Sequence, residues 1–261
     1  MLRVERFFVE NSYQNYNHFI CSSVTKKIVV IDPFDVDDIL ERLRKFKYEL
    51  VAILLTHAHA DHYRGAKDIS EELSVPIYAH IDNYEQVPLM HVGLRGNEII
   101  SLSDDINLKV IDTPGHIKGH VCFYSKPGKF LICGDTIFNA GVGNVKAKSA
   151  NIEELFNSVN IISQLPLDTK IYPAHDYFQT NLEFMLSVSN IEYIKFFLDK
   201  VRKQTPNTRY VSSIRDELKY NLFFSTNNEY VVKQLKEKSN LSHLNKGLAS
   251  FKVLRELRDL W

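Results

Sequence analysis

One segment decides how this chain folds, namely Val51-Ala52-Ile53-Leu54-Leu55-Thr56-His57-Ala58-His59-Ala60-Asp61-His62. Its first five residues are apolar and typical of a buried strand, so the three histidines and the aspartate lie on the loop that leaves the strand's carboxyl end. In α/β proteins, ligands collect at that edge of the sheet. Because histidine and aspartate side chains this close together are poor core fillers unless a cation binds them, the segment predicts a metal site.

The ligand types in this segment define a class of metal. Neutral imidazole nitrogen and carboxylate oxygen suit zinc, and they also suit manganese or ferrous iron. On a turn, His57 and His59 can face one ion while Asp61 and His62 face a second, as two-metal hydrolases require. A surface histidine cluster without function is the alternative, and the strand before the segment argues against it.

Length and composition indicate an ordinary globular protein. The 261 residues suffice for one large α/β domain, with or without a small appendage, and 44% of them are hydrophobic. The sequence shows neither an apolar run long enough to span a membrane nor a signal-peptide pattern, so we expect a cytoplasmic protein that binds no membrane. The three cysteines, Cys21, Cys122 and Cys133, lack metal-type spacing. Reduced core residues are therefore favoured over a catalytic thiol.

The charges balance overall, with 32 basic and 32 acidic residues, but they are unevenly distributed. Residues 1–176 carry 18 basic and 23 acidic side chains, whereas residues 177–261 carry 14 and 9. A basic segment beside an acidic, metal-bearing one can attract an anionic substrate, although a solvated lysine-rich helix has the same composition. No basic run with interleaved aromatic residues occurs, so we expect no nucleic acid partner.

Strand and helix patterns alternate along the first two thirds of the chain, which favours a parallel or mixed sheet covered by helices. Asp35 can cap a helix that runs to Lys47. From about Tyr177 helical patterns dominate, so we predict a catalytic domain at residues 1–176 and a small helical domain at residues 177–261. The predicted strands are residues 3–9, 18–22, 28–31, 51–55, 75–79, 107–111, 121–124, 130–133 and 170–172. The other predicted helices are a stretch ending at Leu73 and residues 152–165, 182–188 and 190–203.

Three later loops each follow a predicted strand and each offer one predicted ligand. They are Asp112-Thr113-Pro114-Gly115-His116, Gly134-Asp135-Thr136 and Pro173-Ala174-His175-Asp176. Each loop alone could be an ordinary turn. Together with residues 56–62, however, four loops would lie at the same edge of the sheet, which predicts a single site. The predicted ligands are His57, His59 and His116 for one ion and Asp61, His62 and His175 for a second, with Asp135 bridging the two.

Other histidines and one aspartate need separate interpretation. His120 is interpreted as a residue that supports a ligand rather than as a ligand, because seven ligands already fill two sites. Asp32 either orients a ligand histidine or turns the chain at Asp32-Pro33. The isolated histidines are interpreted as structural; they are His18, His80, His91 and His243.

The ligand-bearing motifs resemble those of the metallo-β-lactamase superfamily: residues 56–62, 113–116, 134–136 and 174–175. Within that superfamily the chain resembles the glyoxalase II (hydroxyacylglutathione hydrolase) family over almost its whole length. Further matching segments are residues 15–16, 119–122, 134–138, 181–184, 212–221 and 254–259. The resemblance implies an α/β fold, the αββα sandwich, with a small C-terminal helical domain. It also implies two divalent metal ions as cofactors, with zinc favoured and iron or manganese as alternatives.

The resemblance further implies an activity, the hydrolysis of S-D-lactoylglutathione or a related 2-hydroxyacyl-glutathione to the hydroxy acid and glutathione, as in methylglyoxal detoxification. Hydroxide formed from metal-bound water would be the nucleophile. Asp61 and Asp135 would then act as ligands and orienters rather than as a general base. The expected partner is a glutathione thioester, and the expected assembly is a monomer or a weak homodimer.

Substrate contacts are also implied by the resemblance. Arg255 and Arg258 would hold a glutathione carboxylate, which guanidinium groups suit, and Tyr177 would contact the tripeptide. Two departures stand out. Residues 144–147 read Asn-Val-Lys-Ala where the family has a basic residue, an aromatic pair and Glu-Gly, so Lys146 could take over part of the contact. Arg258 replaces a family lysine.

Other chemistries fit the same motifs. The segment Tyr172-Pro173-Ala174-His175-Asp176-Tyr177 is closer to that of persulfide dioxygenases, relatives that use a single iron. A hydrolase of the same fold acting on another thioester is a further alternative. A nuclease or phosphodiesterase ordinarily carries an additional domain, which this sequence lacks. A binding module without catalysis is disfavoured because all seven ligand positions are intact.

Overall fold

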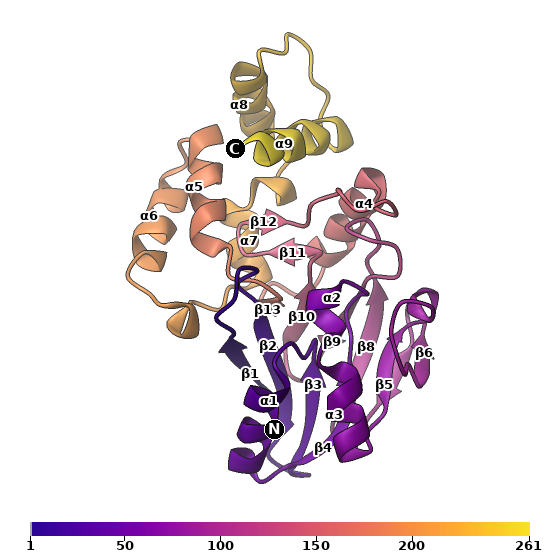
Figure 1. The fold of residues 1–261 in the computed structure, drawn as a ribbon. Coiled ribbons are helices and arrows are strands. Elements are labelled where there is room, and N and C mark those ends of the chain that lie inside the picture. Colours follow the sequence, from indigo (N-terminus) through magenta and orange to yellow (C-terminus); the bar gives the residue numbers. More distant parts are fainter. Residues whose placement is uncertain (1) are drawn as a thin grey trace.

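A computed structural model describes residues 2–261. Two β-sheets pack face to face, and the later helices gather at one end of this sandwich (Figure 1). Among the described residues, no helix combines the length and apolar character needed to cross a membrane. The strands are β1 (Leu2–Phe8), β2 (Tyr16–Ser22), β3 (Lys27–Ile31), β4 (Glu49–Leu54), β5 (Ile77–His80), β6 (Val92–Leu94), β7 (Ile99–Ser101), β8 (Asn107–Asp112), β9 (Val121–Ser125), β10 (Phe130–Gly134), β11 (Ile137–Phe138), β12 (Gly141–Val142) and β13 (Lys170–Pro173). The helices are α1 (Val36–Phe46), α2 (Ala60–Tyr63), α3 (Ala66–Leu73), α4 (Ile152–Ser163), α5 (Phe178–Val188), α6 (Glu192–Val201), α7 (Ile214–Tyr220), α8 (Glu229–Ser239) and α9 (Leu248–Leu260).

The first sheet has the order β1-β2-β3-β4-β5-β6 and contains the strand that leads into the histidine segment. Strands β3 and β4 run parallel, with Val30 opposite Ile53, because α1 carries the chain back between them. Helix α1 begins as predicted, since Asp35 Oδ1 accepts a hydrogen bond from the Asp38 N–H at 3.1 Å. Ile39 and Leu43 of α1 pack with strand residues on the outer face of this sheet.

The second sheet has the order β13-β10-β9-β8-β7. Val110 and Phe123 face the first sheet in one core cluster. On the other face, Leu131 belongs to a cluster that continues through α4 into helices α5 to α9. The helices that follow Asp176 therefore share a hydrophobic core with the second sheet, and the domain boundary placed after residue 176 stays a prediction.

Short strands are the main difference from the sequence-based expectations. Strands β6, β7, β11 and β12 were not predicted, because two or three residues are too few to display an alternating pattern. Helix α5 begins at Phe178 rather than at residue 182. The β11–β12 hairpin lies between the sandwich and the helices, next to the site described below (Figure 1).

The buried histidine of β2 should make the protein sensitive to acid. His18 is 1% exposed, its Nε2 has no hydrogen-bond partner among the described residues, and burial lowers its pKa to about 3, helped by the charge of Arg6. Because the unfolded chain takes up a proton below pH 6.5 and the folded chain does not, His18 reduces the free energy of unfolding as the pH falls. At pH 4 the reduction should be on the order of 3 kcal/mol.

Urea unfolding of the wild type and of His18→Phe between pH 7 and pH 4 checks this expectation. The substitution should flatten the pH dependence, whereas the same change at the exposed His243 serves as the control for losing a histidine. Parallel pH profiles for wild type and His18→Phe would contradict the prediction.

Candidate metal centre and adjoining cavity

Strands from both sheets deliver the predicted ligands to one end of the sandwich. Strand β4 leads into His57 and His59, and the short helix α2 then carries Asp61 and His62. The loops after β8, β10 and β13 deliver the remaining ligands; they are His116, Asp135 and His175. Each ligand thus follows the carboxyl end of a strand, as the sequence predicts, and helix α2 marks the place in Figure 1.

The structure brings all seven predicted ligands together in two groups. Four of them, His57, His59, His116 and Asp135, offer atoms within 4.8 Å of one another, and so do Asp61, His62 and His175. Asp135 lies between the groups. Its Oδ2 is 3.4 Å from His116 Nε2 and its Oδ1 is 3.3 Å from His175 Nε2. One carboxylate oxygen therefore faces each group.

The donor set fits divalent metal ions. His62 Nε2 and Asp135 Oδ1 are buried and have no hydrogen-bond partner among the described residues. His59 Nδ1 lies 2.9 Å from His57 Nε2 and 3.1 Å from His116 Nε2, so three ring nitrogens converge on one point. Buried polar atoms without partners cost free energy, and a bound cation removes that cost.

The pKa shifts of the side chains in the two groups also suit metal binding. Burial, reinforced by neighbouring histidines, lowers the pKa of His57 well below its usual range, so the ring is neutral and can donate a lone pair. Burial opposes ionisation of Asp135, but the charges of His175 and His62 hold its pKa below the usual range. Burial likewise opposes the charge on His62, yet Asp135 and Asp32 raise its pKa to about 9. A metal ion bound at His62 would have to displace this proton.

Partners outside the groups orient the ligand rings. Three ligand histidines each have an oxygen atom close to Nδ1. The Thr56 hydroxyl lies 3.0 Å from Nδ1 of His57. The Asn144 carbonyl lies 2.8 Å from Nδ1 of His116, and the Tyr13 carbonyl lies 2.7 Å from Nδ1 of His175. Each contact directs Nε2 toward the centre, which is the usual support for a metal-binding histidine. The carbonyls of Tyr13 and Asn144 were not predicted, because a backbone acceptor leaves no residue-type signal.

Asp32 combines the two roles left open by the sequence. It has a positive φ of 48° where the chain turns, and its Oδ2 lies 2.9 Å from His62 Nδ1. The same carboxylate accepts hydrogen bonds from the Thr56 N–H at 2.8 Å and the Thr56 hydroxyl at 2.6 Å. Asp32 thus holds His62 and the end of β4 in fixed relation.

Removing the Asp32 carboxylate should weaken metal binding. We expect Asp32→Ala to lower zinc affinity by about 10- to 100-fold, because His62 loses the acceptor that orients it. Competition with a chromophoric chelator measures the affinity, and the exposed Asp104 provides the matched Asp→Ala control. An unchanged affinity in Asp32→Ala would remove Asp32 from the support of His62.

His120 supports the centre without joining either group, as predicted. Its Nε2 accepts a hydrogen bond from the Asp135 N–H at 3.0 Å, and its ring stacks on His57 at 4.8 Å. Asn15 belongs to a segment that matched the family without a predicted role. Its side-chain amide donates a hydrogen bond to Asp61 Oδ2 at 3.1 Å. The other histidines lie outside the groups, and all three cysteines are buried and unpaired, in line with the core interpretation.

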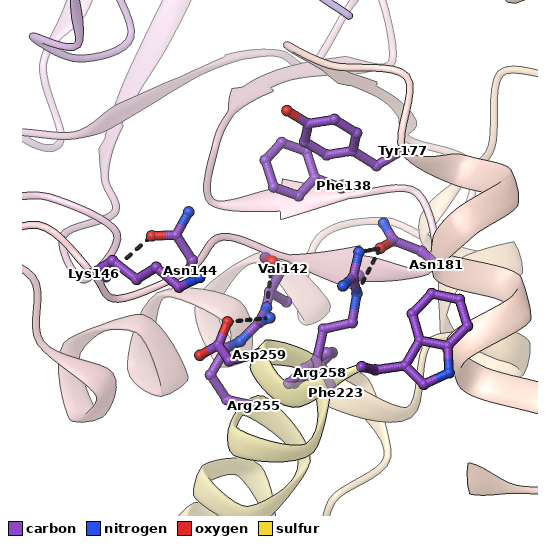
Figure 2. Close-up of a pocket in the computed structure, with 12 residues that line it drawn as sticks. Phe138, Val142, Asn144, Lys146, Tyr177, Asn181, Phe223, Arg255, Arg258 and Asp259 are labelled. Carbon is purple, nitrogen blue, oxygen red and sulfur yellow. Dashed lines mark hydrogen bonds and ion pairs between the residues drawn. The ribbon is translucent and has the colours of Figure 1, made fainter. Parts of the chain in front are cut away.

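A cavity of about 220 Å³ adjoins the centre, and all four predicted substrate contacts line it: Lys146, Tyr177, Arg255 and Arg258 (Figure 2). The Tyr177 ring stacks on His175 at 5.1 Å, and Phe138 lies 5.7 Å from the same histidine. These two rings connect the cavity to the second group of ligands.

The two arginines differ in their freedom to bind a ligand. Arg255 is 6% exposed, and its guanidinium already donates to the Val142 carbonyl at 3.1 Å and to Asp259 at 2.9 Å. Arg258 makes longer contacts of 3.4 Å with Asn181 Oδ1 and lies 5.5 Å from the Trp261 ring (Figure 2). Arg255 therefore holds the end of β12, while Arg258 presents the more available charge.

Comparison with known proteins matches two family models to residues 19–261. The metallo-beta-lactamase superfamily model matches residues 19–175, and the model of the hydroxyacylglutathione hydrolase C-terminus matches residues 176–261. The hydroxyacylglutathione hydrolase of Francisella philomiragia is 36% identical over 99% of both chains, and that of Francisella tularensis subsp. novicida is 34% identical over the same shares.

Solved structures agree on the fold. The crystal structure of ETHE1 from Myxococcus xanthus covers 100% of this chain and 99% of its own, with a TM-score of 0.67 and 20% identity. The BLEG-1 B3 metallo-beta-lactamase covers 85% of this chain and 100% of its own, with a TM-score of 0.67 and 20% identity. The predicted αββα sandwich with a C-terminal helical region is confirmed. The chain belongs to the metallo-beta-lactamase superfamily and, within it, to the hydroxyacylglutathione hydrolase family.

Proposed function

We propose that this protein hydrolyses a glutathione thioester, S-D-lactoylglutathione or a related 2-hydroxyacyl-glutathione, to the hydroxy acid and glutathione. One observation carries the proposal: the seven-residue ligand cluster adjoins a cationic cavity through Tyr177. Full-length relatives named hydroxyacylglutathione hydrolase support the same reaction. The proposed setting is the cytoplasm, where thiols stay reduced, with the chain as a monomer or weak homodimer.

Two divalent ions, zinc by preference, are the proposed cofactors. His57, His59 and His116 with Asp135 Oδ2 would hold one, and Asp61, His62 and His175 with Asp135 Oδ1 would hold the other. Such ions supply Lewis acidity that polarises a thioester carbonyl and lowers the pKa of water toward neutrality. Residues 1–176 thus provide every proposed ligand.

The chain's own residues position the reactants. Asp135 stays ionised between the two groups, and Asn15 fixes the Asp61 carboxylate by its 3.1 Å hydrogen bond. Residues 177–261 contribute Tyr177, Arg255 and Arg258 to the cavity, where Arg258 would receive a carboxylate of the tripeptide. Lys146, on the altered loop, adds a third cation at the opposite wall (Figure 2).

Hydrolysis of S-D-lactoylglutathione by zinc-loaded protein, followed as loss of the thioester, tests the proposal. We expect turnover in the wild type and a loss of at least about a thousandfold in His59→Ala, since His59 Nδ1 faces two other ligand nitrogens. His243→Ala, at an exposed histidine, is the control. No turnover by wild-type protein with metal bound would overturn the proposal.

A second candidate is an iron-dependent glutathione persulfide dioxygenase, favoured by the segment Tyr172-Pro173-Ala174-His175-Asp176-Tyr177. That chemistry uses a single iron, whereas Asp61, His62 and His175 form a second complete group here. Oxygen uptake with glutathione persulfide, measured on protein with one iron per chain, distinguishes the two candidates.

Substitution of the two arginines should separate binding from folding. Arg258→Ala should raise KM by about tenfold with little change in kcat, because only the tripeptide end loses a contact. Arg255→Ala should raise KM too, and it should also lower the free energy of unfolding, because its buried guanidinium holds the Val142 carbonyl. Steady-state kinetics and urea unfolding measure both effects, with Arg258→Lys as the conservative control. An unchanged KM in both alanine variants would remove the helical segment from substrate binding.

A further inference from the structure

A second cavity borders the metal centre at Asp61. Its volume is about 300 Å³, and it shares no lining residue with the first cavity. The residues that line it are Tyr13, Phe34, Ala60, Asp61, Tyr63 and Arg64. Asp61 Oδ2 is 3.6 Å from His175 Nε2, so this cavity reaches the same group of ligands that the first cavity reaches through Tyr177 and Phe138.

Tyr13 lines the second cavity and contacts Tyr177, which lines the first. Its carbonyl oxygen is 2.7 Å from His175 Nδ1 and accepts a hydrogen bond from the Tyr177 hydroxyl at 3.0 Å, while Tyr13 also lines the second cavity. A molecule whose reacting atom sits at the ligands could therefore extend one arm into each cavity.

A thioester has that shape, because its carbonyl carbon carries the sulfur of the thiol carrier on one side and the acyl chain on the other. The first cavity offers Lys146, Asn181 and Arg258, which suit a polar, anionic peptide. The second cavity is then left for the acyl chain. Its volume corresponds to about ten water molecules, which is more room than a lactoyl group needs.

The lining of the second cavity indicates which acyl groups it favours. Phe34, Tyr13 and Tyr63 provide aromatic walls, and the Arg64 guanidinium lies 5.2 Å from the Phe34 ring centroid. Within residues 2–261, no hydrogen bond or ion pair engages the Arg64 side chain; Asp35 and Asp68 border a neighbouring hollow with Arg64 but do not pair with it. A stacked guanidinium without a carboxylate partner is free to donate hydrogen bonds to one.

Resting on the proposed thioester hydrolysis, we infer that the cavity lined by Phe34 and Arg64 is the acyl subsite and that it favours acyl chains ending in a carboxylate. Such a chain places its methylene groups between the aromatic walls and its carboxylate at Arg64. Asp61, the other charge in the lining, belongs to the ligand set that would face a metal ion.

Two thioesters that differ only at the end of the acyl chain test the inference on zinc-loaded protein. S-glutarylglutathione ends in a carboxylate and S-pentanoylglutathione in a methyl group, and S-D-lactoylglutathione reports the proposed function. We expect kcat/KM to be about three- to tenfold higher for the glutaryl than for the pentanoyl thioester. Arg64→Ala should abolish this ratio, Arg64→Lys should keep part of it, and the exposed Arg95→Ala should keep all of it.

Binding of two thioethers that cannot be hydrolysed provides a readout independent of turnover. Calorimetry should give a lower Kd for S-(4-carboxybutyl)glutathione than for S-pentylglutathione in the wild type, and equal values in Arg64→Ala. A wild-type ratio near one, or a ratio that survives Arg64→Ala, overturns the acyl-subsite inference even where S-D-lactoylglutathione is hydrolysed. Binding of both thioethers without hydrolysis of any thioester overturns the proposed function instead.

Discussion

Replacing Asp135 by asparagine should abolish turnover and reduce the bound metal below the wild-type amount. Asp135 directs one oxygen toward each ligand group, with Oδ2 3.4 Å from His116 Nε2 and Oδ1 3.3 Å from His175 Nε2. An amide lacks the charge that would offset the two proposed cations, and its nitrogen cannot coordinate a metal ion. We expect kcat/KM to fall by at least about a thousandfold, which corresponds to about 4 kcal/mol of transition-state stabilisation.

Metal content by elemental analysis and kcat/KM for S-D-lactoylglutathione measure the two parts of this prediction. Asp112→Asn is the matched control, because Asp112 ends strand β8 near the site but its side chain is 48% exposed and lies outside both groups. Full metal content together with near-normal turnover in Asp135→Asn would show that Asp135 does not bridge the groups.

Replacing Glu217 by leucine should cause a large loss of folding stability. Glu217 of α7 is fully buried, and its carboxylate accepts hydrogen bonds from Ser212, Tyr220, Asn221, Asn139 and the Ala140 N–H, at 2.7 to 3.3 Å. Leucine would leave the Ser212 and Tyr220 hydroxyls and the Ala140 N–H without an acceptor. Asn139 and Asn221 would keep their other acceptors, Ser212 Oγ and the Gly141 carbonyl. We expect the free energy of unfolding to fall by roughly 3–5 kcal/mol, as for other buried networks that lose a partner.

The Glu217 network also positions the cavity. Asn139 and Ala140 form the turn between β11 and β12, and Phe138, Gly141 and Val142 beside that turn line the cavity. Glu217→Gln, which keeps one acceptor oxygen, should lose less stability than Glu217→Leu. Urea unfolding of both variants checks the order, and a leucine variant as stable as the wild type would show that the network contributes little.

Ligand chemistry was predictable because it is local. Residues 56–62 carry four ligand-type side chains within one short segment, and an apolar strand before them places the segment at a sheet edge. His116, Asp135 and His175 follow other strands in the same way, so their convergence could be expected before the fold was known. The supporting role of His120 could be expected for the same reason.

The orientation of the histidine rings was not predictable, because it depends on contacts between distant parts of the chain. The carbonyl that directs His175 belongs to Tyr13, 162 residues away, and the carbonyl that directs His116 belongs to Asn144. Backbone oxygens are the same in every residue and leave no mark on composition. The burial of Arg255 against the Val142 carbonyl escaped prediction for the same reason, since charge alone suggests an exposed residue.

The sequence by itself determined the residue types of the proposed ligands, their order along the chain, the sandwich with its helical tail and the family. Side-chain identity and hydrophobic periodicity carry that information, and both are properties of short segments. Only the tertiary structure shows that each Asp135 oxygen faces a different ligand group. It also shows which arginine is available to a ligand and that a second cavity lies beside Asp61. These features arise where segments far apart in the chain pack together, so their distances and burial exist only in the folded molecule.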